Sequence, residues 1–253
     1  MSAIIQPGRY EITRVVRRVF ATLRRNAITY VLLAGLLSFA PRVLWGTLRA
    51  QLIGGDQTLL VVVTFGGSAL ILLAGVLLQA ALVHGAVEDL RGDRSSWGRS
   101  LRAGTERLLP AIGLALVVVV ALALAGLLLL VPGLVLALMW MAAVPALVVE
   151  RRGVRASLAR SAKLTEGRRW AVLGTLLLFL AFGCVVFVVC SLVVGLFGVA
   201  YEAATLALLK NLIGPLFAAL FAVISSVMVA TIYHELKTAR EGEGVEALAA
   251  AFD

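Results

Sequence analysis

The chain has 253 residues, of which 61% are apolar and 15% are charged, whereas soluble domains average roughly 45–50% and 25%. The apolar residues form long runs without acidic or basic groups, such as residues 59–85 and 110–149, which are typical of membrane-spanning segments. A soluble domain is therefore excluded. We expect a single all-α integral membrane domain over residues 1–253, with too few residues left for a separate soluble catalytic domain.

The formal net charge of +9 points to one of two partners. In a soluble protein it would suggest nucleic acid. In a membrane protein, Lys and Arg are retained beside the anionic cytoplasmic leaflet, and this second explanation fits the composition. No nucleic-acid partner is predicted.

The first predicted element is a basic amphipathic helix over residues 11–25. Its apolar residues recur at helical spacing and its arginines lie largely off that stripe, so the helix should lie in the plane of the membrane interface. The segment lacks the continuous apolar stretch of a cleavable signal peptide, and we expect it to be retained. The arginines that would face lipid headgroups are Arg14, Arg17, Arg18, Arg24 and Arg25.

Six apolar segments follow, and we predict that each forms a membrane-spanning helix. A helix needs roughly 20 residues to cross a bilayer. The predicted spans are residues 27–48, 59–85, 111–131, 134–149, 171–198 and 213–233. Residues 235–253 are predicted to form a cytoplasmic tail.

Prolines interrupt the later spans. Pro132 and Gly133 are the strongest chain-breaking pair within residues 110–149, so they predict a tight turn between the third and fourth spans. Pro145 lies within the fourth span and Pro215 near the start of the sixth. These prolines either break helices to line a cavity, as in transporters, or only set kinks and a turn. The sequence favours the second interpretation.

Residues 95–109 and 153–169 are predicted to form two further amphipathic interfacial helices, before the third and fifth spans. Their basic residues, which would contact anionic headgroups, are Arg99, Arg102, Arg155, Arg160, Lys163, Arg168 and Arg169. The chain then consists of three copies of one interfacial helix followed by two spans. Weak matches between the copies support a repeat, but shared composition explains them equally well.

The distribution of Lys and Arg predicts the orientation. With both termini inside, 20 of the 23 basic residues lie on the cytoplasmic side, and Arg42, Arg49 and Lys210 lie outside. The positive-inside rule therefore predicts six spans with cytoplasmic N- and C-termini.

Several short motifs carry a family resemblance. They are Pro132-Gly133, Pro145 followed by Glu150, Arg160-Ser161, Leu164-Thr165 leading to Gly167, Arg25-Asn26 and Tyr233-His234-Glu235-Leu236. With these motifs the chain resembles, over essentially its whole length, the membrane domain that accompanies a glycerophosphoryl diester phosphodiesterase in some bacterial proteins, and related six-span families of unassigned role. The resemblance implies an integral module of the bacterial inner membrane. The phosphodiesterase itself is a separate soluble domain with acidic metal ligands and a catalytic His, which this chain lacks, so its activity is not carried over.

Candidate catalytic and binding residues are few. The predicted spans carry no charge at mid-depth, where one would cost at least about 2.5–3.5 kcal/mol, and this disfavours a proton- or sodium-driven transporter. Glu150 is either a buried partner for Arg160 or a solvated helix end. His84 and His234 fit interfacial polar residues better than metal ligands, and no metalloprotease or nucleophile-elbow motif occurs. No catalytic residue, cofactor or metal is predicted.

Three function classes remain. The leading hypothesis is a non-enzymatic scaffold or accessory subunit whose cytoplasmic helices bind anionic lipids, at roughly 1 kcal/mol per Lys or Arg, and which associates with other membrane proteins. The alternative is a small transporter or permeation module for lipidic or peptide substrates, working between the kinked spans. An intramembrane enzyme would need a cluster of polar side chains at one depth, which the sequence does not offer.

Overall fold

The computed structural model describes residues 11–52, 55–92, 96–128, 130–200 and 203–249, and every regular element in these ranges is a helix. Six of the helices are long and apolar enough to cross a membrane. The prediction of a polytopic all-α protein with six candidate spans is therefore confirmed. Short helices also occur where the three basic amphipathic segments were predicted, although their position at a membrane interface stays a prediction.

The N-terminal part contains the first basic helix and the first two candidate spans. Helix α1 (Ile12–Arg25) is followed by α2 (Ala27–Ala34), a π-helical turn η1 (Gly35–Phe39), α3 (Ala40–Leu52) and α4 (Gln57–Leu90). Pro41 lies just after the π-helical turn. Proline has no N–H to donate within the helix, and helices bend at prolines and at π-helical turns. The first candidate span is therefore interrupted by a π-helical turn next to Pro41.

Small residues let α3 approach α4 closely. A Cβ atom added at Gly67 would lie only 1.8 Å from Cδ1 of Trp45, and the indole Nε1 donates a hydrogen bond of 3.2 Å to the carbonyl of Val63. At Gly66 a Cβ would meet nothing within 4 Å. Of this glycine pair, Gly67 alone is required by packing.

The middle part contains α5 (Trp97–Glu106), α6 (Leu108–Leu128), α7 (Leu130–Trp140), α8 (Ala143–Val149) and α9 (Val154–Thr165). The predicted turn at Pro132 and Gly133 is wrong, because α7 already begins at Leu130 and includes both residues. Proline is tolerated there since the first N–H groups of a helix have no partner within it. Gly133 instead lies against α6, where an added Cβ would be 3.4 Å from the backbone nitrogen of Gly126.

The C-terminal part is a pair of long helices, α10 (Arg169–Ala200) and α11 (Ala203–Ala249). Helix α11 continues through Pro215 and extends beyond both ends of the predicted sixth span. Much of the predicted tail, residues 235–249, is therefore a continuation of this helix, and residues 250–253 lie outside the described residues. Where α11 extends beyond the membrane into water, it can carry charged side chains, which are costly within a spanning segment.

The buried core lies toward the charged end of the molecule. It joins α1, α4, α8 and the second half of α11, and includes Val15, Leu82, Ala146, Val227 and Ile232. By contrast, the most hydropathic stretches of α4 and α10 contain no buried residues. Because apolar side chains lie on the outside of these helices, the helices are suited to contact with lipid tails.

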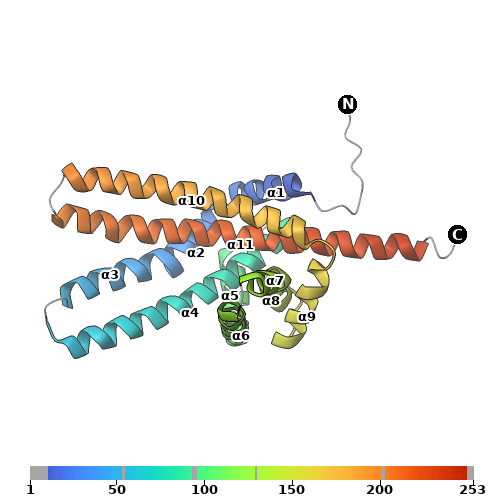
Figure 1. The fold of residues 1–253 in the computed structure, drawn as a ribbon, viewed down its shortest axis with the longest axis horizontal. Coiled ribbons are helices and arrows are strands. Elements are labelled where there is room, and N and C mark those ends of the chain that lie inside the picture. Colours follow the sequence, from blue (N-terminus) through green and yellow to red (C-terminus); the bar gives the residue numbers. More distant parts are fainter. Residues whose placement is uncertain (1–10, 53–54, 93–95, 129, 201–202, 250–253) are drawn as a thin grey trace.

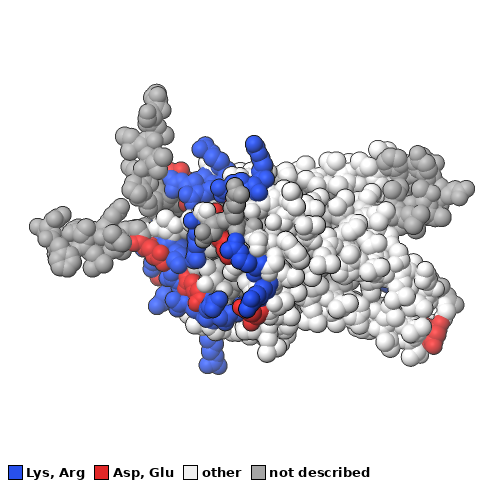
Figure 2. All heavy atoms as spheres, turned by 180° about the vertical axis from the view of Figure 1, so that it is seen from behind, with Lys and Arg blue, Asp and Glu red and all other residues white. Residues whose placement is uncertain are grey.

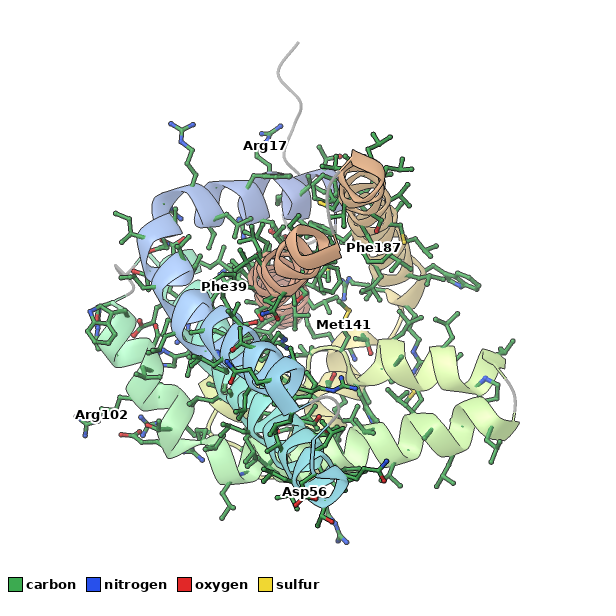
Figure 3. The ribbon with its side chains drawn as sticks, turned by 90° about the vertical axis from the view of Figure 1, so that its left-hand side faces the viewer. Arg17, Phe39, Asp56, Arg102, Met141 and Phe187 are labelled. Carbon is green, nitrogen blue, oxygen red and sulfur yellow. The ribbon has the colours of Figure 1, made fainter. Side chains whose placement is uncertain are left out.

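The candidate spans do not all run in one direction. In Figure 1 the helices α3, α4, α10 and α11 extend along the long axis, whereas α6 and α7 are seen end-on. In Figure 3, which looks along that axis, α6 and α7 run across the view and the other long helices are seen end-on. The α6–α7 hairpin therefore lies crosswise to the four long helices.

Candidate lipid-binding collar

Most Lys and Arg side chains gather at one end of the molecule, as Figure 2 shows. We call this region the basic collar and define it by the residues predicted from the sequence to face headgroups on α1, α5, α9 and the turn before α10. They are Arg14, Arg17, Arg18, Arg24, Arg25, Arg99, Arg102, Arg155, Arg160, Lys163, Arg168 and Arg169. Some of them pair with carboxylates in the structure, and others are exposed.

Glu235 of α11 holds α1 in place. Its Oε1 lies 2.8 Å from Nη1 of Arg18, and its Oε2 lies 3.8 Å from Nη1 of Arg14. Arg18 also lies 3.1 Å from Nδ1 of His234. The Glu235 side chain is only 5% exposed, so its charge needs these partners. Arg14 and Arg18 are therefore structural residues rather than free headgroup ligands.

A second ion pair fixes the other end of α1. Nη2 of Arg25 donates to Oδ2 of Asp89 over 2.8 Å, linking α1 to the last turn of α4. The Asp89 side chain is 8% exposed. The sequence hypothesis missed this carboxylate as a partner. Its position at the end of an apolar run, opposite an Arg-rich helix, is the signal that could have identified it.

Glu150, at the end of α8, is a third point of attachment. Its Oε1 accepts hydrogen bonds from the Tyr233 hydroxyl at 2.7 Å and from Nε of Arg160 at 3.1 Å, and its Oε2 accepts from Nε of Arg152. Arg160 also reaches Glu241 at 3.2 Å. Of the two interpretations of Glu150, the buried partner of Arg160 is the one that the geometry matches.

These bonds also determine the acidity of the group. Burial alone would raise the pKa of Glu150, but the hydrogen bonds from Tyr233, Arg160 and Arg152 outweigh it and hold the pKa below its ordinary value. For Arg160, burial would lower the pKa, but the neighbouring Glu150 carboxylate raises it. Both groups are therefore charged at neutral pH, and the charges stabilise each other.

Ser161 forms hydrogen bonds with the backbone where the fourth candidate span is interrupted. Between α7 and α8 the chain leaves the helix at residues 141–142, shortly before Pro145, which has no N–H to donate. The Ser161 hydroxyl donates to the carbonyl of Met139 at 2.7 Å and accepts from the N–H of Ala142 at 3.0 Å. The sequence motifs at Pro145, Glu150 and Arg160-Ser161 thus meet in one place.

Helix α1 presents different residues to different sides, at 100° per residue. The face toward the bundle is buried and consists of Val15, Val19 and Thr22. The ion-paired face carries Arg14, Arg18 and Arg25. The opposite face is apolar and consists of Val16, Phe20 and Leu23.

Arg17 and Arg24 lie one heptad apart on the remaining edge of α1, which is farthest from the bundle. Both are exposed, and Figure 3 shows Arg17 pointing away from the other helices. This edge borders the apolar face of α1, so a lipid beside the protein would have its headgroup near the guanidinium groups and its acyl chains below them.

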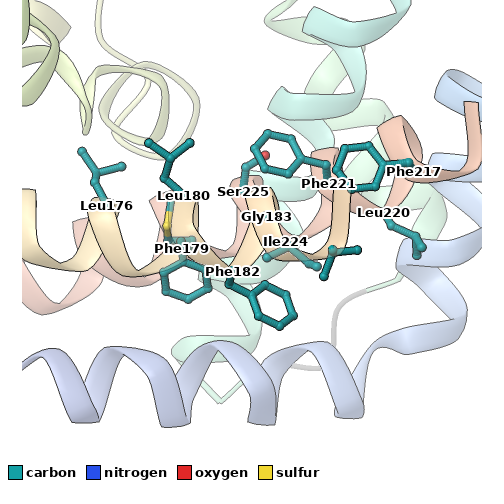
Figure 4. A pocket seen from close by; sticks show the side chains of 12 residues that line it. Leu176, Phe179, Leu180, Phe182, Gly183, Phe217, Leu220, Phe221, Ile224 and Ser225 are labelled. Atoms are coloured by element: carbon teal, nitrogen blue, oxygen red, sulfur yellow. The ribbon is translucent and has the colours of Figure 1, made fainter. Parts of the chain in front are cut away.

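Three apolar pockets open on the side of the molecule that would face lipid. One, of about 200 Å³, is lined by Phe20 and Leu23 of α1 together with residues of α10 and α11. A second, of about 430 Å³, lies between α2 and α11. The third, of about 330 Å³, lies between α10 and α11, where Figure 4 shows Phe179, Phe182 and Phe221 around it. Ser225 is the polar residue in its lining.

The remaining predicted residues are not brought together into one site. Arg155 and Lys163 are exposed on α9, and Arg102 pairs with Glu106 of its own helix at 2.9 Å. Arg99 contacts Ser96, and Arg168 and Arg169 lie at the turn into α10. Neither Pro145 nor Pro215 lines any of these three pockets, and the interpretation of the prolines as kinks stays a prediction.

Within the described residues, no set of three His, Cys, Asp or Glu side chains is arranged to bind a metal. Cys184 and Cys190 are both free thiols on α10.

The chain was compared with known protein families, curated proteins and solved structures. The family model described as the membrane domain of glycerophosphoryl diester phosphodiesterase matches residues 112–240, just over half of the chain. No curated protein and no solved structure matches the chain. The matched region contains the α6–α7 hairpin, the Glu150 and Ser161 contacts and most of α11.

Proposed function

Since the chain belongs to the family of the membrane domain of glycerophosphoryl diester phosphodiesterase, we propose that it is a non-enzymatic scaffold or accessory subunit of the membrane whose basic collar binds anionic lipids. The match covers a membrane domain and not a catalytic domain. We also propose that the protein resides in a bacterial inner membrane with both termini in the cytoplasm. The concentration of basic residues at one end (Figure 2) supports this orientation.

The observation that carries the proposal is the edge of α1 with Arg17 and Arg24. Both guanidinium groups are exposed, while Arg18 and Arg25 on the adjacent face are paired with carboxylates. The apolar pocket beside Phe20 lies next to this edge. Two cations above an apolar groove suit a lipid with an anionic headgroup, at roughly 1 kcal/mol per basic residue.

The test is to replace Arg17 and Arg24 with Gln and to measure lipid binding by native mass spectrometry. The double variant should lose about 2 kcal/mol of binding free energy. This loss should weaken phosphatidylglycerol binding by up to about 30-fold, while phosphatidylcholine binding stays the same. The matched control is Arg151→Gln with Arg240→Gln, which removes the same charge from exposed positions outside the proposed site. If the control variant loses phosphatidylglycerol binding equally, the effect is due to net charge alone. If the Arg17 and Arg24 variant binds as well as the wild type, the site is refuted.

The scaffold part of the proposal concerns other membrane proteins. A gentle purification followed by mass spectrometry should recover stoichiometric partners with the wild-type protein. If the protein travels alone with lipid, the scaffold role is wrong even where the lipid site is right.

A lipid transporter is the second candidate, and the pocket between α10 and α11 favours it. Its lining is apolar apart from Ser225, so it would suit an acyl chain but not an ion. Proteoliposomes that contain fluorescently labelled phosphatidylglycerol distinguish the two functions. A transporter would bring inner-leaflet label to an outside quencher faster than empty liposomes do, whereas a scaffold would not change the rate.

A further inference from the structure

Among the described residues, the buried contacts of α6 with the rest of the protein lie at the base of the α6–α7 hairpin. In α6 the buried residues are Ala111 and Leu114, in its first two turns, and they pack with Ala80 of α4 and Leu147 of α8. From Ala115 to Leu127 the side chains are half-buried or exposed, and Leu127, near the tip, is 85% exposed.

The direction of the hairpin is different from that of the four long helices. Figures 1 and 3 agree that α6 and α7 run crosswise to α4, α10 and α11. Helices α4 and α10 have 34 and 32 residues, or roughly 50 Å each, which is ample to cross a hydrocarbon core of about 30 Å. Helices that run crosswise to each other cannot both follow the membrane normal, so if the long helices cross the membrane, the hairpin runs along its plane.

The depth of the hairpin follows from its neighbours. In Figure 1, α6 and α7 lie at the same level along the long axis as the basic helix α1. Helix α9, with its Arg and Lys residues, packs against the hairpin, since Val154 lies 3.8 Å from a Cβ placed at Gly113. The hairpin is therefore close to the charged end and not at the centre of the membrane.

The composition of the hairpin indicates which part of the membrane surrounds it. Helix α6 is apolar on all sides and has no charged residue from Leu108 to Leu128. Its surface therefore needs acyl chains and not headgroups around it, unlike the amphipathic α1. A helix about 10–12 Å in diameter fits within one hydrocarbon leaflet, which is about half of 30 Å.

We propose that the α6–α7 hairpin does not span the bilayer but lies lengthwise among the acyl chains of the leaflet on the charged side of the protein. Helix α6, about 30 Å long, and α7, about 16 Å long, are each about 10 Å wide and would together occupy roughly 470 Å² in that leaflet alone. The hairpin thus displaces lipid from one leaflet only. Four helices cross the membrane in this arrangement, and the inference does not depend on headgroup binding by Arg17 and Arg24.

The test is a depth profile along α6 in proteoliposomes of phosphatidylcholine and phosphatidylglycerol. Single cysteines replace exposed residues in a Cys184→Ala, Cys190→Ala background, a fluorophore is attached, and quenchers at different positions on the lipid tails report its depth. The exposed positions on α6 are Leu109, Val119 and Leu127. The matched control on α10 uses Leu177, Val185 and Val193, which are also exposed.

We expect similar depths at all three α6 positions, whereas on α10 the middle position should be deeper than the outer two by about 12 Å. A spanning hairpin would instead place Val119 about 12–15 Å deeper than the ends of α6. Greatest depth at Val119 or at Leu127 would overturn the proposal. Because every labelled side chain is exposed, the substitutions remove no buried contact.

A second readout uses a maleimide that cannot cross membranes. Leu127→Cys should not react from the side on which Gly55→Cys reacts. Reaction of both from the same side would show that the tip of the hairpin crosses the membrane and would refute the one-leaflet arrangement.

Discussion

The hydroxyl of Tyr233 on α11 donates a 2.7 Å hydrogen bond to the carboxylate of Glu150 at the end of α8, across 83 positions of sequence. The same carboxylate accepts from Arg160 of α9. The consecutive helices α8 and α9 therefore meet the distant helix α11 at one acidic group. This contact joins the middle of the chain to its C-terminal helix and gives the charged end of the molecule a defined arrangement.

Replacing Tyr233 with Phe should destabilise the protein by about 1.5–3 kcal/mol, the usual range for a hydrogen bond to a charged group. The ring is buried and stays in place, so the change isolates the hydroxyl. The measurement is reversible unfolding in mixed micelles, combined with Glu150→Gln and the double variant. A coupling energy near zero in this cycle would show that the bond contributes nothing.

Stability should fall in acid because of Glu150. The pKa of Glu150 is held below its ordinary value in the folded protein, so the unfolded chain, at about 4.3, takes up the proton first. The stabilisation is therefore complete above about pH 5 and is lost as pH falls through the folded pKa. In melting curves from pH 7 to pH 3, the wild type should lose its advantage over Glu150→Gln. A constant difference across this range would contradict the prediction.

Ser161→Ala should destabilise the protein by about 1–3 kcal/mol, because the carbonyl of Met139 and the N–H of Ala142 lose their partner in a buried place. The matched control is Ser157→Ala. Ser157 is also buried on α9, but its hydroxyl bonds only to the carbonyl of Gly153 one turn earlier. Thermal unfolding of both variants should show the larger loss at Ser161, and equal losses would contradict the proposed repair of the break.

Gly67→Ala should separate α3 from α4, because the new methyl group would overlap the indole of Trp45. We expect a destabilisation of about 1–3 kcal/mol, as in other overpacked contacts. Gly66→Ala is the control, since its Cβ meets nothing within 4 Å, and it should be neutral or stabilising by up to about 1 kcal/mol. Unfolding measurements on the two variants that gave the reverse order would refute the role of Gly67.

The helical class and the approximate positions of the apolar segments follow from the sequence alone. Hydropathy and the 3.6-residue period are local properties, and each apolar run must bury its backbone groups in a helix wherever it lies in the membrane. The basic character of residues 11–25, 95–109 and 153–169 is equally local. The sequence left two interpretations of Glu150 open, a partner of Arg160 and a solvated helix end, and the packing of α9 against α8 brings the two side chains together.

Only the tertiary structure decided which basic residues are free. Arg17 and Arg18 are adjacent in sequence, but Arg18 faces Glu235 and Arg17 faces outward, since the difference depends on how α1 rotates against α11. The direction of α6 and α7 was equally unpredictable, because an apolar helix has the same composition whether it crosses a bilayer or lies within one leaflet. The sequence determined which segments enter the membrane, and long-range packing decided how they are oriented there.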